Sequence, residues 1–167
     1  MRGLTLIGMP GVGKSTVGDI LSKKLGFKFL DLDVYICNQA DKKLVNIVRD
    51  IGEDEFLKLE ERGALSLDLA NTVFAPGGSI VYSQAVMDKL LKETMVFYLS
   101  LPLEELTKRL GNDIDQRGVI GFSKGLRAIY SERGLLYEQF THEIIDCVGL
   151  DGQAIAAEIV EKYRLRA

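Results

Sequence analysis

The most restrictive feature of this sequence is a glycine-rich segment near its start. Residues 8–15 read GMPGVGKS and fit the pattern G-x-x-x-x-G-K-[ST]. Glycines allow positive φ angles, so successive backbone N–H groups can converge on one point. A short apolar run (residues 4–7) precedes the segment, and residues 14–25 follow it with apolar side chains at helical spacing. A strand, a glycine loop and a helix in this order predict a phosphate-binding loop in an α/β fold.

The rest of the chain alternates between apolar runs of strand length and segments with a helical period. We predict further strands at 27–32, 72–75, 95–99 and 143–147, and helices at 44–51, 53–69, 83–91, 102–110, 126–140 and 153–163. Such alternation predicts a three-layer α/β/α fold around a parallel sheet. No linker-like segment divides the chain, so we expect a single domain over residues 1–167.

Composition excludes several classes of protein. The net charge of the 167 residues is −3, which favours neither nucleic acid nor an anionic membrane surface. The apolar runs are far shorter than the roughly 20 residues of a membrane span, and residues 4–7 fit a first strand better than a signal peptide. Cys37 and Cys147 form no CxxC pair, so we expect free thiols in the cytoplasm. His142 is the only histidine, which argues against a histidine metal site.

The glycine loop supplies three kinds of group to a nucleotide. Its amides and the amino end of the next helix attract phosphate, Lys14 can reach the β- and γ-phosphates, and the Ser15 hydroxyl can bind Mg²⁺. We therefore expect ATP to bind Gly11, Val12, Gly13, Lys14, Ser15 and Thr16. The alternative is a glycine-rich turn without a ligand.

Two carboxylates follow the second predicted strand. Asp31 and Asp33 are two residues apart, so they would face the same side of a strand, at the sheet edge where α/β proteins bind ligands. One can organise Mg²⁺, while the other holds or deprotonates a hydroxyl group of the acceptor. The alternative is a pair of solvated acids, or a helix cap for a segment starting at Val34.

Taken together, the motifs resemble the shikimate kinase family. The shared features are the glycine loop, Asp31-Leu32-Asp33, Gly52-Glu53 with Phe56 and Glu60, the turn Gly77-Gly78, Arg117, and Glu132-Arg133 followed by Tyr137. The resemblance implies a five-stranded parallel sheet, an acceptor-binding segment at about 33–62 and a mobile lid at about 111–125. It implies transfer of the γ-phosphoryl group of ATP to the 3-hydroxyl of shikimate, with Mg²⁺.

The resemblance also implies roles for individual residues. Lys14, Asp33 and Arg117 would be catalytic, with Asp33 as the base; Ser15 and Asp31 would hold Mg²⁺; Arg133, Glu60, Gly77 and Gly78 would form the acceptor pocket; and Arg109 and Gln153 would border the adenine. The alternatives are solvated charges at Arg109, Arg117 and Glu60, and a surface ion pair of Arg133 with Glu132 or Glu138.

One departure from the family bears on the acceptor. The family has an arginine after the Phe of Gly-Glu-x-x-Phe, as a second partner of the shikimate carboxylate, and this chain has Leu57. A charge-assisted hydrogen bond contributes roughly 1.5–3 kcal/mol, so its loss should weaken binding. Arg49, Lys58 or Arg62 would be the substitutes. Ser79 replaces a third glycine of the turn, and Gly118 replaces a proline of the lid.

Three functions follow from these patterns. The first is a shikimate kinase, which we expect to be a monomer. The second is a related kinase for another small hydroxylated acid or polyol, because of Leu57 and Ser79. The third is a nucleotide-binding protein with a degenerate acceptor site.

Overall fold

A five-stranded parallel sheet forms the centre of the protein, whose computed structural model describes residues 2–111 and 117–166. The strands are β1 (Gly3–Ile7), β2 (Lys28–Asp31), β3 (Thr72–Ala75), β4 (Thr94–Ser100) and β5 (Glu143–Asp146), and they lie in the order β2-β3-β1-β4-β5. All four strand pairs are parallel. The predicted five-stranded parallel sheet is therefore confirmed.

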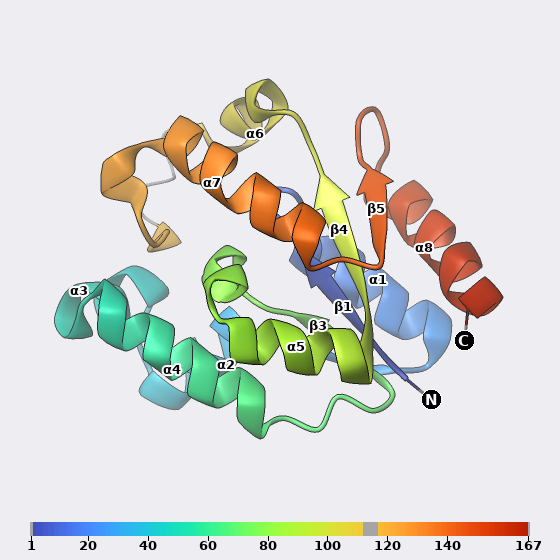
Figure 1. The fold of residues 1–167 in the computed structure, drawn as a ribbon, viewed down its shortest axis with the longest axis horizontal. Coiled ribbons are helices and arrows are strands. Elements are labelled where there is room, and N and C mark those ends of the chain that lie inside the picture. Colours follow the sequence, from blue (N-terminus) through green and yellow to red (C-terminus); the bar gives the residue numbers. More distant parts are fainter. Residues whose placement is uncertain (1, 112–116, 167) are drawn as a thin grey trace.

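Helices cover both faces of this sheet (Figure 1). They are α1 (Lys14–Leu25), α2 (Leu32–Ala40), α3 (Leu44–Ile51), α4 (Glu53–Ser66), α5 (Gln84–Glu93), α6 (Leu103–Leu110), α7 (Leu126–Gln139) and α8 (Gly152–Arg166), with the short 3₁₀ helices η1 (Gly78–Tyr82) and η3 (Phe122–Lys124). In Figure 1, α5 and α7 lie in front of the sheet, whereas α1 and α8 pack together on its other face. This is the three-layer α/β/α arrangement that the alternation of segments predicted.

The central strands are apolar because both faces of the sheet are covered. Every residue of β1 and β3 is buried, as are the first six residues of β4. The one polar pair between β1 and β4 is satisfied, since the hydroxyl groups of Thr5 and Thr94 share a hydrogen bond of 2.8 Å. The buried centre thus gives the carboxyl ends of the strands a rigid base.

Glycines set both ends of α1. Gly13 precedes the helix with φ 108°, and Gly26 follows it with φ 68°, a left-handed conformation that residues with a Cβ seldom adopt. Gly26 closes the helix by donating its N–H to the carbonyl of Ser22. The helix therefore has the bounds that its apolar period predicted.

The structure corrects the prediction for the second strand. β2 ends at Asp31, and α2 starts at Leu32, so the alternative of a capped helical segment near Val34 is confirmed. The carboxylate of Asp31 accepts a hydrogen bond from the Val34 N–H, so Asp31 is the N-cap of α2. Asp33 therefore lies in the first turn of a helix and not on a strand, and the argument from strand alternation was wrong for it.

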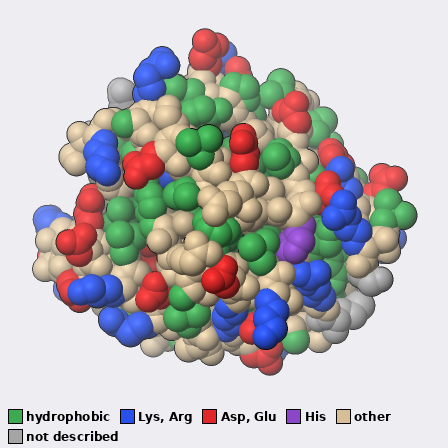
Figure 2. Space-filling view, in the orientation of Figure 1, with side chains coloured by type: hydrophobic (Ala, Val, Ile, Leu, Met, Phe, Trp, Pro, Cys, Tyr) green, Lys and Arg blue, Asp and Glu red, His purple; other side chains and the backbone are tan. Residues whose placement is uncertain are grey.

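The segment 111–125, predicted as a lid, follows α6. Its residues 112–116 lie outside the described part of the chain, and residues 117–125 include η3. No helix among the described residues combines the length and the hydrophobicity needed to cross a lipid bilayer. Acidic and basic side chains are interspersed over the face seen in Figure 2, in keeping with the small net charge.

Candidate active site

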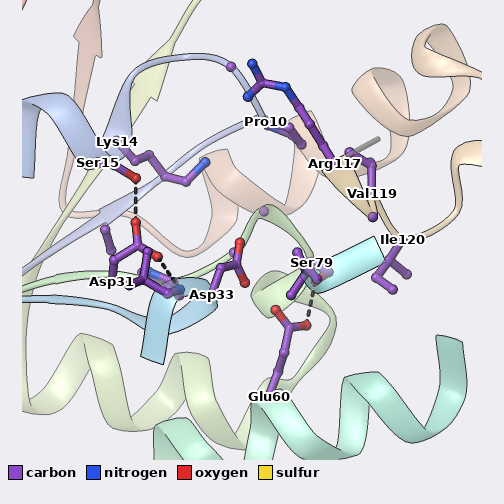
Figure 3. A pocket seen from close by; sticks show the side chains of 18 of the residues that line it. Pro10, Lys14, Ser15, Asp31, Asp33, Glu60, Ser79, Arg117, Val119 and Ile120 are labelled. Carbon is purple, nitrogen blue, oxygen red and sulfur yellow. Dashed lines mark hydrogen bonds between the residues drawn. The ribbon is translucent and has the colours of Figure 1, made fainter. Parts of the chain in front are cut away.

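A cavity of about 500 Å³ opens beyond the carboxyl ends of the strands. Its wall includes the glycine loop, the first turn of α2, the helix α4, the turn after β3, residues 117–120 and the helix α7. Figure 3 shows Lys14, Asp31 and Asp33 at one side and Ser79, Glu60 and Ile120 at the other. Parallel α/β sheets bind ligands at this edge, so the cavity is the candidate active site.

The glycine loop forms one end of the cavity. Gly11 and Gly13 have φ angles of 82° and 108°, which allow the backbone to curve around a central point. The ammonium of Lys14 lies across the loop and donates hydrogen bonds of 2.7 Å and 3.1 Å to the carbonyls of Gly8 and Met9. Burial lowers the pKa of Lys14 to about 8, although the charge of Asp33 raises it. The amino end of α1 has no acidic residue in its first turn, which suits an anionic ligand.

Two further nucleotide contacts were expected at Arg109 and Gln153. The guanidinium of Arg109 lines the cavity and donates to the carbonyl of Val12 at 3.1 Å, so α6 is tied to the glycine loop. Gln153 lies exposed in the first turn of α8 and is not part of the cavity wall. Its contact with adenine stays a prediction.

Ser15 and Asp31 lie together beside the loop. The Ser15 hydroxyl donates to Asp31 Oδ2 at 2.5 Å, while Asp31 Oδ1 caps α2. Figure 3 shows this hydroxyl–carboxylate contact beside Lys14. A hydroxyl and a carboxylate are hard oxygen ligands of the kind that Mg²⁺ takes from a protein. Within residues 2–111 and 117–166, no group of three or more His, Cys, Asp or Glu side chains is placed to bind a metal.

Two carboxyl groups form the floor of the cavity, the half-buried Asp33 and the buried Glu60. Asp33 Oδ1 and Glu60 Oε1 are both shielded from solvent and have no hydrogen-bond partner in the described part of the chain. Burial, followed by the charge of Asp31, raises the pKa of Asp33 to about 6. Burial, followed by the charge of Asp33, raises the pKa of Glu60 to about 8. Because a buried carboxyl group seldom lacks a partner, these two oxygens point to a ligand.

The turn after β3 brings the backbone close to these groups. A Cβ on Gly77 would come within 2.7 Å of Glu60 Oε1 and 2.8 Å of Asp33 Oδ1. A Cβ on Gly78 would come within 3.0 Å of Arg133 Nη1 and 3.1 Å of the Tyr137 hydroxyl. A side chain at either position would therefore displace the end of at least one of these side chains. The Tyr137 hydroxyl donates to the Gly78 carbonyl at 2.6 Å and fixes the turn.

Arg133 lies opposite this turn and is only 1% exposed. Its Nη2 donates to the carbonyl of Ile120 at 2.6 Å, and its Nε donates to the Tyr82 hydroxyl at 3.3 Å. The guanidinium also lies over the Tyr82 ring, 5.3 Å from its centre. The alternative of a surface ion pair with Glu132 or Glu138 is therefore wrong. The contacts with Tyr82 and Ile120 carried no signal in the sequence, because the partners are far apart along the chain.

Residues 117–121 close the remaining side. Arg117, Val119 and Ile120 line the cavity, and Figure 3 shows Arg117 next to the loop residue Pro10. The Gly121 N–H donates to Glu53 Oε1 at 3.0 Å, which joins this segment to α4. Arg117 is exposed, so both its predicted role and the solvated alternative stay open.

Comparison with known proteins decides the family. A model of the family described as shikimate kinase matches residues 10–164. A shikimate kinase of Persephonella marina is 36% identical over 141 residues, which cover 83% of this chain and 85% of that protein. This chain belongs to the shikimate kinase family. The prediction of this family from the sequence motifs is therefore confirmed.

Other members of the shikimate kinase family match nearly end to end. A shikimate kinase of Clostridium botulinum is 35% identical over 169 residues, which cover 98% of this chain and 97% of that protein. The structure of shikimate kinase from Acinetobacter baumannii in complex with shikimate superposes with a TM-score of 0.88, at 26% identity over 99% of this chain and 94% of that one. The fold predicted from the resemblance is therefore confirmed over the whole described chain.

Leu57 remains the main difference from the shikimate kinase pattern. Leu57 does not line the main cavity but a neighbouring cavity of about 130 Å³, together with Lys58, Glu60, Ser79 and Tyr82. Arg49, Lys58 and Arg62, the substitutes considered for the missing arginine, are exposed, and none of them lines the main cavity. The structure therefore does not support a direct replacement by any of the three. Ser79, which replaces a glycine of the turn, directs its side chain to Glu60 and donates to Oε2 at 2.5 Å.

Proposed function

We propose that this protein transfers the γ-phosphoryl group of ATP to the 3-hydroxyl group of shikimate. One observation carries the proposal: a single cavity joins a phosphate-binding loop to a buried, unpaired carboxyl oxygen of Asp33 and a buried Arg133. The loop and Lys14 suit a triphosphate, whereas Asp33 and Arg133 suit a hydroxyl and a carboxylate on one small molecule. Family membership supports the same substrates.

The reaction needs one bond made and one broken. The acceptor oxygen forms a bond to the γ-phosphorus, the bond from that phosphorus to the β,γ-bridging oxygen breaks, and ADP leaves. Asp33 takes the proton of the acceptor hydroxyl, while Lys14 and the amides of the loop bind the oxygens on which negative charge accumulates. We propose that Arg117 approaches the transferred group as residues 111–125 close over the reactants, which excludes water.

Mg²⁺ fits the oxygen donors beside the loop. Ser15 and Asp31 would hold the ion, with phosphate oxygens and water as its other ligands, in keeping with the small number of protein ligands that Mg²⁺ needs. When bound, Mg²⁺ neutralises charge on the β- and γ-phosphates. Arg109, next to the loop, and Gln153 are proposed to border the adenine.

A second candidate is a related kinase for another small hydroxylated acid or polyol. The observation that favours it is the composition of the main cavity wall. Leu57 lines a neighbouring cavity instead, and the wall of the main cavity does not include Arg49, Lys58 or Arg62. An acceptor without a carboxylate would need fewer cations there. A nucleotide-binding protein with a degenerate acceptor site is less well supported, because Asp33 and Arg133 still face the cavity together.

The deciding experiment measures ADP release by the purified protein with Mg²⁺ and ATP, with and without shikimate. We expect ADP release to depend on shikimate, and one phosphate monoester to form for each ADP. A panel of sugar acids and polyols assayed in parallel separates the second candidate. Absence of ADP release with every acceptor, while ATP still binds, would favour the third function.

We further propose that the protein is a cytoplasmic monomer with this one domain. The two cysteines were expected to be buried, which holds for Cys147, whereas Cys37 is half-buried. Sedimentation equilibrium tests the oligomeric state, since a monomer has a mass of 18.5 kDa.

A further inference from the structure

Glu60 occupies an unusual position for an acidic residue. It lies on α4, is only 1% exposed, and takes part in no ion pair among the described residues. Its Oε2 accepts a hydrogen bond from the Ser79 hydroxyl, whereas its Oε1 is buried without a partner and lies on the wall of the cavity. A buried carboxylate without a cation is costly, so the carboxyl group should hold a proton.

Burial and one neighbouring charge favour this protonated form, and two other groups around Glu60 oppose it. From α2, Asp33 faces it with a like charge; from η1, Ser79 donates to it; and from α7, the charge of Arg133 opposes protonation. The Arg133 N–H groups are directed to Ile120 and Tyr82 and not to Glu60. On α4 itself, Lys58 pairs with Glu55 and so does not neutralise Glu60, and Glu61 is an acid that accepts from Ser83.

The geometry also assigns the proton to one oxygen. The Ser79 hydroxyl occupies Oε2 and can donate to it, whereas Oε1 has no partner, so a proton on Oε1 leaves each carboxyl oxygen with one role. Oε1 faces the same side of Gly77 as Asp33 Oδ1, since a Cβ on Gly77 would come within 2.7 Å and 2.8 Å of the two oxygens. Both are therefore close enough for a single hydroxyl oxygen of a ligand to contact them together.

We propose that Glu60 binds the acceptor as a neutral carboxylic acid, which donates from Oε1 to the acceptor hydroxyl that itself donates to Asp33. This proposal rests on the proposed phosphoryl transfer and names the groups that position its acceptor. A hydroxyl oxygen has one proton and two lone pairs. With its proton on Asp33 and one lone pair on Glu60, the other lone pair is left to face the γ-phosphate. Two ionised carboxylates would instead compete for one proton.

The proposal predicts that acceptor affinity falls at alkaline pH. Burial raises the pKa of Glu60 to about 8, so the neutral form dominates at pH 7 and is lost by pH 9. If the ionised form does not bind, the affinity for shikimate falls about tenfold between these pH values. Lys14 also titrates near pH 8, but its contribution is the same in the wild type and in variants of Glu60.

The test is calorimetric titration with shikimate in the absence of nucleotide, from about pH 7 to about pH 9. In Glu60→Gln, the amide nitrogen reproduces the donor on Oε1 at every pH, so the extra alkaline loss of affinity should disappear. Glu55→Gln, an exposed glutamate of the same helix, is the matched control and should keep the wild-type slope. Ser79→Ala should move the loss to higher pH, because the Ser79 hydrogen bond lowers the pKa of Glu60.

Two results would overturn the proposal. One is an alkaline slope that is the same in Glu60→Gln and the wild type. The other comes from ¹³C NMR of the ligand-free wild type, if the Glu60 carboxyl carbon, assigned by comparison with Glu60→Gln, titrates near the ordinary pKa of 4.5 instead of about 8. Should shikimate not bind at any pH, the proposed function fails, and the NMR titration still decides the protonation state of Glu60.

Discussion

Replacement of Arg133 by lysine is the sharpest test of the acceptor pocket. The guanidinium is 1% exposed, donates to Ile120 and Tyr82, and directs Nη1 toward Gly78. Lysine keeps the charge but loses the planar fork that can bind both oxygens of a carboxylate. A hydrogen bond to a charged group contributes about 1.5–3 kcal/mol, so the affinity for shikimate should fall about 10- to 100-fold.

Calorimetric titration measures this affinity in Arg133→Lys, the wild type and Arg127→Lys. Arg127 is an exposed arginine of the same helix, so its replacement should leave the affinity for shikimate unchanged. The affinity for ATP should stay within about threefold in both variants, because both keep the positive charge and the hydrogen bonds of Arg133 go to Tyr82 and Ile120 and not to the glycine loop. A wild-type affinity for shikimate in folded Arg133→Lys would refute the assignment of Arg133 to the acceptor carboxylate.

Four further predictions concern the remaining parts of the site. Lys14→Ala should lower turnover by about a thousandfold or more while shikimate still binds, because a cation that binds the transferred phosphoryl group is lost; turnover near that of the wild type would exclude this role. Gly77→Ala should weaken shikimate binding at least about tenfold through contact of its Cβ with two carboxyl oxygens, and calorimetry with ATP is the control. Tyr137→Phe should lower the free energy of unfolding by about 1 kcal/mol, measured with urea, because the buried hydrogen bond to the Gly78 carbonyl is lost; an unchanged midpoint would contradict the reasoning. The pKa of Glu60 is raised from 4.5 to about 8, so between these pH values the folded protein keeps a proton that the unfolded chain has released, and the contribution of Glu60 to stability declines as the pH rises. Glu60→Gln should therefore make the free energy of unfolding less dependent on pH over this window. A steeper decline in the variant than in the wild type would contradict this sign.

Much of the fold is predictable because its signals are local. The loop of residues 8–15 is bounded by an apolar strand and by a helix that ends at Gly26, and each of these signals lies within a few residues. The helices α1 and α3 and the strand β3 have the predicted bounds. The helix α2 was considered only as an alternative, with a cap before Val34, because the same carboxylate suited a ligand; in the structure the side chain of Asp31 does cap the helix.

The details of the acceptor pocket are less predictable, because they depend on side chains distant in the sequence. The motifs indicated Glu60 and Arg133 as pocket residues, but not that Ser79 donates to Glu60 or that Arg133 donates to the Ile120 carbonyl. The burial of Glu60 also follows only from packing of α4 against η1 and α5. Periodicity along one helix does not give the direction of such contacts.

The hydrogen bond from Arg133 to the Ile120 carbonyl has a consequence for how the cavity can open. Displacement of residue 120 would leave a buried charged N–H group and a peptide carbonyl without partners at the same moment. Opening on this side therefore requires water molecules to enter beside the guanidinium as the backbone departs. If Arg133 binds the acceptor as proposed, an acceptor bound before they enter would hold the cavity shut, and recognition of the substrate and exclusion of solvent would then depend on one side chain.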